Sequence, residues 1–364
     1  MTKRMMIVFT GGTIGSKLAG ADINVSGAGS YSLLEQYTKQ PVARKDLAFD
    51  TIQPLNLLSE NMTTADLVTL ASAIRGVDPG AYQGIVVTHG SDTLAYTAAM
   101  MSYLFSDVKI PIVFTCSNYP LEDERSNGLR NFTSAIDFIE EAALPGVFAV
   151  YENGEGDSVV YLGTRLRQCE AFTDQFRGVG DIAYGRMEGG SFLWERDRRN
   201  PWPQELLQAS ETALEWEPDK LQLESGVVYI RPYPGLDYSL YNWGESGRPK
   251  VILHDLHHSG TACVAGDERN SLLIFLDRCR EQGIAVYLCP IKDLSDALYD
   301  SSRRLVDAGA VFIENMSMEA ALTKLMLAYG IYESHEDAKA FMMEKNVYFE
   351  RLWVYDRVDS TEEE

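Results

Sequence analysis

The sequence lacks the features that mark secreted, membrane-spanning and metal-binding proteins. Its 364 residues include five cysteines and no CxxC pair, so neither a disulfide framework nor a zinc ribbon is predicted. No apolar run approaches the roughly 20 residues that span a bilayer. The short apolar run after Lys3 and Arg4 is too brief for a signal peptide. Free thiols persist in a reducing compartment, so the expected location is the cytoplasm.

Basic residues are also scarce. Lysine and arginine number 32 against 53 aspartates and glutamates, which gives a formal net charge of −21 at pH 7. Nucleic acids and anionic membranes attract basic surfaces, so neither is expected as a partner. Residues 359–364 are predicted to form a solvated acidic tail. Hydrophobic residues make up 45% of the chain, which is enough apolar material for two domain cores.

Short apolar runs alternate with amphipathic stretches over the first half of the chain. Continuous apolar strands separated by helices are typical of a parallel sheet that is covered on both faces. The predicted strands are residues 5–9, 84–88, 110–115 and 158–162, and the predicted helices are 63–75, 93–105 and 127–142.

The alternation stops at residues 194–224, which are rich in charge, tryptophan and proline and include a predicted helix at 203–215. Beyond them we predict strands at 227–230, 251–256, 284–288 and 310–313, and helices at 269–283, 293–308, 316–330 and 335–345. The expected fold class is therefore α/β with two domains. A larger N-terminal domain (1–198), a linker (199–224), a smaller C-terminal α/β domain (225–358) and the tail (359–364) are the predicted parts.

Open parallel sheets bind ligands beyond the carboxyl ends of their strands, so the chemistry should lie in strand-to-helix loops. The first such loop reads TGGTIG at residues 10–15 and offers the hydroxyl of Thr13 beside free backbone N–H groups. On its own it also fits a tight turn in which Thr13 bonds the backbone. No phosphate-binding lysine follows, so the loop is a weak candidate for nucleotide binding.

Two further loops carry polar groups. The loop HGSDTL at residues 89–94 places the hydroxyl of Ser91 beside the carboxylate of Asp92, before a predicted helix. Either side chain could simply cap that helix, or the pair could serve nucleophilic chemistry at its positive end. The third loop, TCSNYP at 115–120 followed by RSNG at 125–128, could present N–H groups to an oxyanion, although alone it fits a turn.

The TGGTIG and HGSDTL loops, in this order and separation, resemble those of the L-asparaginase family. The resemblance continues through SENMT at 59–63 and PIVFTCSNYPLEDERSNGLRNFTSAI at 111–136. Residues 307–325 are similar to the cytoplasmic type I branch, so the likeness spans nearly the whole chain. It implies hydrolysis of a side-chain amide to acid and ammonia, without metal or cofactor. It also implies a homodimer or homotetramer in which a neighbouring subunit completes the pocket.

The resemblance assigns roles to individual residues. Thr13 stands at the position of the primary nucleophile, and Ser91 at the position of the family's second threonine. Asp92 matches the aspartate that contacts the substrate amine and supports the second hydroxyl. Ser59 and Glu60 match the residues that hold the substrate carboxylate and amine.

Several positions depart from the family pattern. Asp22 aligns with the tyrosine that helps to activate the first threonine, and Tyr31 is the nearest tyrosine that could replace it. Gln168 aligns with the family's lysine, and a glutamine amide cannot accept a proton near neutral pH, whereas a lysine with a lowered pKa can. Cys116 stands where glycine is usual, which would narrow the substrate pocket, and Asn127 stands where aspartate is usual.

These departures leave two classes of function open. The first is an amidohydrolase that acts on L-asparagine or a related small carboxamide through Thr13. The second is a catalytically weak homologue that binds an amino acid or a protein partner. The run His254-Asp255-Leu256-His257-His258 could ligate a metal, but successive strand residues point to opposite faces, so no metal site is predicted. Cys116 and Cys169 lack a visible base and are weaker candidates for the nucleophile.

Overall fold

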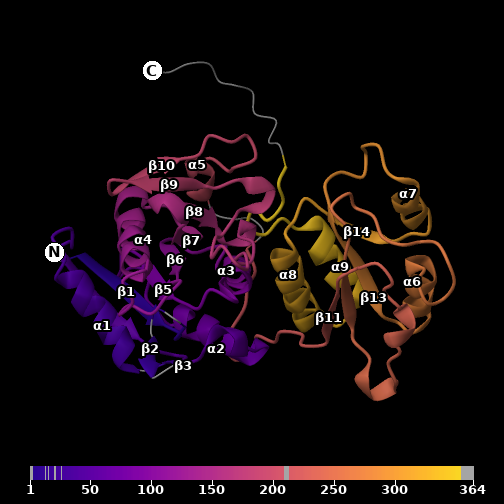
Figure 1. The fold of residues 1–364 in the computed structure, drawn as a ribbon, viewed down its shortest axis with the longest axis horizontal. Helices are drawn as coiled ribbons and strands as arrows, with labels where there is room; N and C mark the ends of the chain where they lie inside the picture. The colour runs from indigo at the N-terminus through magenta and orange to yellow at the C-terminus, as the bar shows by residue number, and fades with distance from the viewer. Residues whose placement is uncertain are drawn as a thin grey trace.

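The computed structural model describes residues 3–12, 14, 16–19, 22–25, 27–208 and 213–353. It places the side chains of residues 3–12, 14, 32–154, 156–208, 213–244 and 246–353. A larger N-terminal domain and a smaller C-terminal domain lie side by side, each with a sheet and covering helices (Figure 1). The predicted two-domain α/β fold class is therefore confirmed, while the residue numbers given to the domain boundaries stay predictions.

The N-terminal domain is built on an eight-stranded sheet in the order β10-β9-β8-β7-β6-β5-β1-β4. Strands β4, β1, β5, β6 and β7 pair in parallel. Of these, β1, β5 and β6 match predicted strands, whereas β4 and β7 were not predicted. The pairs β7–β8, β8–β9 and β9–β10 are antiparallel, which the sequence analysis did not foresee. The bounds are β1 (Lys3–Phe9), β4 (Leu47–Ile52), β5 (Ile85–Thr88), β6 (Pro111–Thr115), β7 (Gly146–Glu152), β8 (Ser158–Leu162), β9 (Gly185–Glu188) and β10 (Ser191–Trp194).

Helices cover both faces of this sheet. Helices α1 (Gly27–Thr38) and α4 (Gly128–Ala142) share one core cluster, whereas α2 (Thr64–Arg75) and α3 (Leu94–Leu104) belong to the cluster on the other face. Helix α2 begins with a capping box: the Thr63 hydroxyl accepts the Asp66 N–H, and the Asp66 carboxylate accepts the Thr63 N–H. An antiparallel hairpin of β2 (Ser16–Ala19) and β3 (Asp22–Val25) precedes α1.

The C-terminal domain has a four-stranded parallel sheet in the order β11-β12-β13-β14. Helices α6 and α7 cover one face, and α8 and α9 cover the face toward the N-terminal domain (Figure 1). The bounds are β11 (Val227–Ile230), β12 (Val251–Asp255), β13 (Ala285–Ile291), β14 (Val311–Glu314), α6 (Leu272–Glu281), α7 (Asp300–Asp307), α8 (Met318–Ile331) and α9 (His335–Glu344).

For three helices the predicted bounds were wrong. The helix expected at 203–215 is only α5 (Pro203–Leu206) among the described residues, and Leu206 is its one buried side chain, too little to hold a longer helix against a core. Helices α6 and α7 begin later than expected. Before α7 the Asp293 carboxylate accepts the N–H of Ser295 (2.7 Å), a local bond that competes with helix formation.

The two domains share one apolar core. Helix α3 packs against α8, and a single cluster contains Tyr103 from α3 and Leu325 from α8. The buried Tyr103 hydroxyl donates to the carbonyl of Ala320 (3.1 Å), which joins the helices across the domain boundary. Within the described part of residues 3–208 and 213–353, every helix is too short or too polar to span a membrane.

After α9 the chain returns to the N-terminal domain as residues 346–353, which we call the C-terminal strap. The Thr164 hydroxyl donates to the carbonyl of Tyr348 (2.8 Å). The Arg165 guanidinium, almost fully buried, donates to the carbonyls of Phe349 (2.6 Å) and Arg351 (3.1 Å). These bonds attach the strap to the turn that directly precedes residues 166–168.

A buried ion pair fixes the strap to the C-terminal domain. The Lys324 ammonium on α8 lies 2.6 Å from the Glu350 carboxylate, and both side chains have no exposed surface. The same carboxylate accepts the backbone N–H groups of Val347 (3.0 Å) and Tyr348 (2.8 Å). A buried charge needs such partners, because removal from water is costly unless hydrogen bonds replace the lost hydration.

Candidate active site

At the carboxyl ends of three neighbouring strands, the chain continues to helices on opposite faces of the sheet. Strand β5 leads to α3 on one face of the sheet, whereas its neighbours β1 and β6 lead to α1 and α4 on the other face. Open α/β sheets bind ligands in the crevice that such a divergence creates. The three loops singled out in the sequence follow β1, β5 and β6, so the topology brings them to one edge of the sheet.

Two glycines let three segments touch at this edge. Gly12 donates its N–H to the carbonyl of Leu57 (3.0 Å) and has a φ of +72°, which glycine adopts readily. A Cβ on Gly12 would lie 2.5 Å from the nitrogen of Gly90, and a Cβ on Gly90 would lie 2.3 Å from the Ser59 Oγ. The first loop, the segment around residue 59 and the second loop are therefore in direct contact.

Thr13, the predicted nucleophile, lies outside the described residues, as does Gly15. The residues on either side of Thr13 are described. Gly12 contacts Gly90 as above, and Ile14 is buried in the core on the α1 and α4 face. The first loop is thus found where the sequence placed it, and the role of Thr13 stays a prediction.

Ser59 offers a buried hydroxyl to this edge of the sheet. Its side chain is 3% exposed, and its Oγ has no hydrogen-bond partner of good geometry among the described residues. Its carbonyl accepts the Thr93 hydroxyl (3.0 Å), which fixes the segment against the start of α3. An unsatisfied buried hydroxyl costs about 1–3 kcal/mol, so the Ser59 Oγ is suited to a ligand that supplies the missing bond.

Asp92 and Glu60 place two carboxylates beside Ser59. The pKa of Asp92 is raised, first by burial of its carboxyl group and then by the charge of Glu60. The nearby Ser59 hydroxyl acts in the opposite direction, although its geometry falls short of a good hydrogen bond. Asp92 keeps part of its surface exposed, so solvent moderates these effects. A carboxylate with a raised pKa is a better proton acceptor than an ordinary one.

The helix cap expected at Ser91 or Asp92 was wrong. Helix α3 begins one residue later, and its N-cap position is Thr93, whose hydroxyl donates to the Ser59 carbonyl instead of capping the helix. Neither Ser91 nor Asp92 is used to cap the helix. The functional roles given to both side chains stay predictions.

Cys116 directly follows β6 and is fully buried. Burial raises the pKa of its thiol well above the ordinary range, and the charges of Cys169 and Asp92 add to that effect. Burial also raises the pKa of Cys169 to about 12. Thiols held neutral in this way are poor nucleophiles at neutral pH. Cys116 is therefore a poor candidate for the nucleophile, and its effect on the volume of the substrate pocket stays a prediction.

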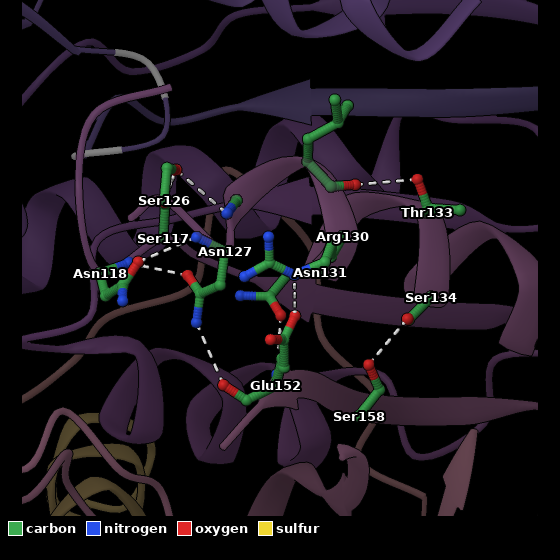
Figure 2. Close-up of polar contacts among 12 residues, drawn as sticks. Ser117, Asn118, Ser126, Asn127, Arg130, Asn131, Thr133, Ser134, Glu152 and Ser158 are labelled. Carbon is green, nitrogen blue, oxygen red and sulfur yellow. Dashed lines mark hydrogen bonds and ion pairs between the residues drawn. The ribbon is translucent and has the colours of Figure 1, made fainter. Parts of the chain in front are cut away.

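The third loop is held in shape by a network of amides (Figure 2). The Asn118 N–H donates to the Asn127 Oδ1, and the Asn127 N–H donates to the Asn118 Oδ1, both at 3.0 Å. The Asn127 Nδ2 donates to the carbonyl of Glu152 (3.1 Å), and the Asn131 Nδ2 donates to the carbonyl of Cys116 (2.8 Å). Asn127, at the family's aspartate position, thus has a structural role that a neutral amide can fill.

The two divergent positions lie in different surroundings. Asp22 lies in β3, where the structure describes the backbone alone, and the same holds for Tyr31 in α1. Gln168 is exposed and its side-chain Oε1 accepts the Tyr96 hydroxyl at 3.4 Å, a long bond. The Gln168 N–H donates to the Glu319 carboxylate (2.7 Å), which comes from the C-terminal domain.

Sequence reasoning missed Tyr96 and Glu319. Tyr96 lies on α3, one turn after Asp92, and Glu319 lies in the first turn of α8. Burial and the Glu319 charge raise the pKa of Tyr96 to about 12, so the phenol stays protonated. No local motif marks either residue: Glu319 reaches Gln168 through the packing of the two domains, and Tyr96 through the packing of α3 against the turn Gly163–Arg165.

His89 positions the second loop from within the protein. Its Nδ1 lies 2.9 Å from the carbonyl of Gly90, so this nitrogen must carry the proton, and its backbone N–H donates to the carbonyl of Thr115 (2.8 Å). The ring is fully buried, and burial lowers its pKa to about 4. His89 is therefore neutral at physiological pH, and its Nδ1–H is occupied by the Gly90 carbonyl.

His254, at the end of β12, is a second buried histidine. Its Nε2 lies 2.9 Å from the Tyr238 hydroxyl, and its pKa is lowered by burial to about 4. His257 and His258 are exposed, so the three histidines do not converge. Within the described part of the chain, no three His, Cys, Asp or Glu side chains are arranged to hold a metal ion.

The two buried histidines predict a loss of stability in acid. Each has a folded pKa of about 4 against an ordinary value of 6.5, so the unfolded chain binds protons first as the pH falls. Their stabilising contribution is complete above pH 6.5 and declines toward pH 4, by roughly 3 kcal/mol for each histidine. Urea unfolding between pH 7 and pH 4 measures the decline. A midpoint near 6.5 for the His89 ring resonances would contradict it.

A family model described as "Asparaginase, N-terminal" matches residues 4–200, more than half of the chain. The chain belongs to the asparaginase family. It is an enzyme of this family, an amidohydrolase, and the resemblance drawn from the TGGTIG and HGSDTL loops is confirmed.

Individual asparaginase relatives match over almost the whole chain. The L-asparaginase of Thermococcus kodakarensis is 28% identical over 94% of this chain and 98% of its own length. A solved structure of the thermostable L-asparaginase from Thermococcus kodakarensis has a TM-score of 0.77 at 25% identity, covering 96% of this chain and 99% of that one. A glutamyl-tRNA(Gln) amidotransferase subunit from Pyrococcus horikoshii is 24% identical over 97% of this chain and 78% of its own length.

Proposed function

We propose that this enzyme hydrolyses the side-chain amide of L-asparagine or of a related small carboxamide. The observation that carries the proposal is the contact of the first loop, the segment around residue 59 and the second loop beside the Ser59 hydroxyl, which has no good partner among the described residues. This arrangement lies at the divergence of β1, β5 and β6, and it collects Ser59, Glu60, Ser91 and Asp92 beside the loop that carries Thr13.

In the proposed reaction the Thr13 hydroxyl adds to the amide carbonyl. Its proton passes to the amide nitrogen, ammonia leaves, and an ester links Thr13 to the acyl group. Water then attacks the ester, gives its proton back to the Thr13 oxygen and releases the acid. We propose that Asp92, whose pKa is raised by burial and by Glu60, briefly holds the proton of that water, received through the Ser91 hydroxyl, before it returns to the Thr13 oxygen.

Ammonia release tests this proposal. We expect wild-type protein to release ammonia from L-asparagine or another small amide, and Thr13→Ala to lower that release by at least about 10³-fold, because the nucleophile is lost. Thr69→Ala is the matched control. This variant also loses a threonine hydroxyl, one that is exposed on α2 and donates to the Ala65 carbonyl (2.9 Å), and it should keep wild-type activity.

The variant Gln168→Lys separates an active enzyme from an inactive homologue. Ammonia release that Thr13→Ala abolishes would establish an enzyme with an altered proton relay. Wild-type protein that releases no ammonia, combined with release by Gln168→Lys, would contradict the proposal. The chain would then be a catalytically weak homologue that binds an amino acid or a protein partner.

A second candidate function comes from the relatives named as glutamyl-tRNA(Gln) amidotransferase subunits. The one from Pyrococcus horikoshii matches 97% of this chain and is itself longer. We infer that this chain could act as one component of an amidotransferase. Full ammonia release by the purified chain alone would favour the asparaginase function over this one.

We also propose a homodimer or homotetramer in the cytoplasm. Phe172 is fully exposed, at 105% of its reference surface, and adopts a φ of +73°, which is costly for an aromatic residue. A neighbouring subunit that covers this ring would offset the cost of its exposure. All five cysteines are free, as expected of a protein in a reducing compartment.

A further inference from the structure

Glu319 is a buried carboxylate at the boundary between the two domains. Only 8% of its surface is exposed. Among the described residues its carboxylate forms one hydrogen bond, with the backbone N–H of Gln168 (2.7 Å), and no ion pair. It lies in the first turn of α8, where the positive end of the helix dipole favours a negative charge. Withdrawing a carboxylate from water is costly, so the bond to Gln168 is important for holding Glu319 in this place.

The bonded N–H belongs to residues 166–178, which we call the hairpin segment. Its two arms pair through an antiparallel bridge and through the Arg167 N–H, which donates to the carbonyl of Arg177 (2.9 Å). The next N–H, that of Gln168, is not used within the hairpin segment, and Glu319 accepts it instead. Backbone N–H groups away from water require a partner. Glu319 is thus the partner that fixes this end of the hairpin segment to the C-terminal domain.

The hairpin segment also lies against the helix that follows the second loop. The Tyr96 hydroxyl, in the first turn of α3, donates to the Gln168 Oε1 (3.4 Å). The turn just before the hairpin segment approaches the same helix closely, since a Cβ on Gly163 would lie 2.3 Å from the Ser102 Oγ. Residue 168, which aligns with the family's lysine, is therefore held beside the start of α3 on one side and by α8 on the other.

We propose that Glu319 is a positioning residue for amide hydrolysis. Through the backbone N–H of residue 168 it fixes the hairpin segment beside the second loop. The C-terminal domain thereby sets part of the geometry of a site that the N-terminal domain builds. The inference rests on the proposed hydrolase function, and it gives Glu319 no part in the proton transfers.

Three substitutions separate the hydrogen bond of Glu319 from its charge. Glu319→Ala removes the acceptor, and a displacement of about 1 Å in groups that orient a substrate can cost about 100-fold in rate. We therefore expect kcat to fall by about 100-fold, while KM changes by less than about threefold because no contact with the substrate is lost. Glu319→Gln keeps an oxygen that can accept the N–H and should restore most of the activity. Glu319→Asp keeps the charge, but it is one methylene group shorter and should resemble Glu319→Ala.

Two further variants make the test specific. In Gln168→Ala, residue 168 keeps its backbone N–H, so adding Glu319→Ala should lower kcat by the same factor as in the wild-type background. Glu336→Ala is the matched control: it removes an exposed glutamate from the first turn of α9 and should leave kcat and KM unchanged. The midpoint of thermal unfolding shows whether each variant is folded. If Glu319→Ala does not fold, the contrast between Glu319→Gln and Glu319→Asp decides.

The outcomes separate this inference from the proposed function. Wild-type kcat in Glu319→Ala, or equal activity of Glu319→Gln and Glu319→Asp, would overturn the positioning role while the hydrolase function stands. If no amide yields ammonia, the hydrolase function fails, and the amide resonances of Ser91 and Asp92 decide the positioning role. Resonances that move in Glu319→Ala and return in Glu319→Gln, together with faster hydrogen exchange at residue 168 in Glu319→Ala alone, would support it. Unchanged resonances would overturn it.

Discussion

Replacing Lys324 by methionine should lower the free energy of unfolding by about 3–5 kcal/mol. The change keeps the shape of the side chain but leaves the Glu350 carboxylate charged and without its partner, at a position with no exposed surface. The carbonyls of Met342 and Lys345 would also lose the ammonium as a hydrogen-bond donor. Urea unfolding followed by circular dichroism measures the loss.

A double-mutant cycle assigns this loss to the buried pair. Adding Glu350→Gln removes the unpaired charge, while the new amide oxygen can still accept the N–H groups of Val347 and Tyr348. The double variant should therefore recover at least half of the lost stability. Lys220→Met is the control: its ion pair with Glu217 is exposed, so the expected change is below about 1 kcal/mol. Equal effects at Lys324 and Lys220 would contradict the role given to the pair.

Replacing Gly90 by alanine should reduce amide hydrolysis by about 100-fold or more. The new methyl group would lie 2.3 Å from the Ser59 Oγ and 2.6 Å from its Cβ, so Ser59 or the whole second loop must move. A displacement of about 1 Å in groups that position a substrate can cost about 100-fold in rate. Ammonia release and the midpoint of thermal unfolding should both fall.

Removing the contact between the new methyl group at residue 90 and Ser59 tests whether that clash causes the loss of activity. In Gly90→Ala combined with Ser59→Gly, both short contacts disappear, so thermal stability should return and activity should match that of Ser59→Gly alone. Gly247→Ala is the matched control, because a Cβ there meets no atom within 4 Å. A Gly90→Ala protein with unchanged stability and activity would show that the loops are not packed as described.

Much of the fold follows from local apolar patterns, and the misses have physical causes. Strand β7 (Gly146–Glu152) was overlooked although six of its seven residues are buried, because a short apolar run after a helix resembles the end of that helix. Strands β9 and β10 are short and half exposed, and their antiparallel pairing depends on partners that a sequence pattern does not name. Helices with a clear cap, such as α2, were placed within a residue.

The site was partly predictable for a similar reason. Residues 10–12 and 89–92 each follow a predicted strand, and parallel strands bring their carboxyl ends to the same edge, so their meeting could be expected. Residues 59–60 come after β4, which was not predicted, and only the family resemblance pointed to them. The partners of Gln168 could not be predicted from the sequence. Glu319 lies 151 residues further along the chain and reaches Gln168 only through the packing of α3 against α8. The hydroxyl partner of Gln168, Tyr96, lies in the same domain and reaches it because α3 packs against the turn Gly163–Arg165.

The core that α3 and α8 share has a mechanical consequence. Swinging the domains apart would expose Tyr103 and Leu325 to water and would pull on the strap that Lys324 holds. Extensive apolar interfaces suppress hinge bending between domains. Substrate and product must then reach and leave the carboxyl ends of β1 and β5 through rearrangement of loops alone. The motion of those short segments would then set the rate of turnover, while the two domains stay rigidly joined.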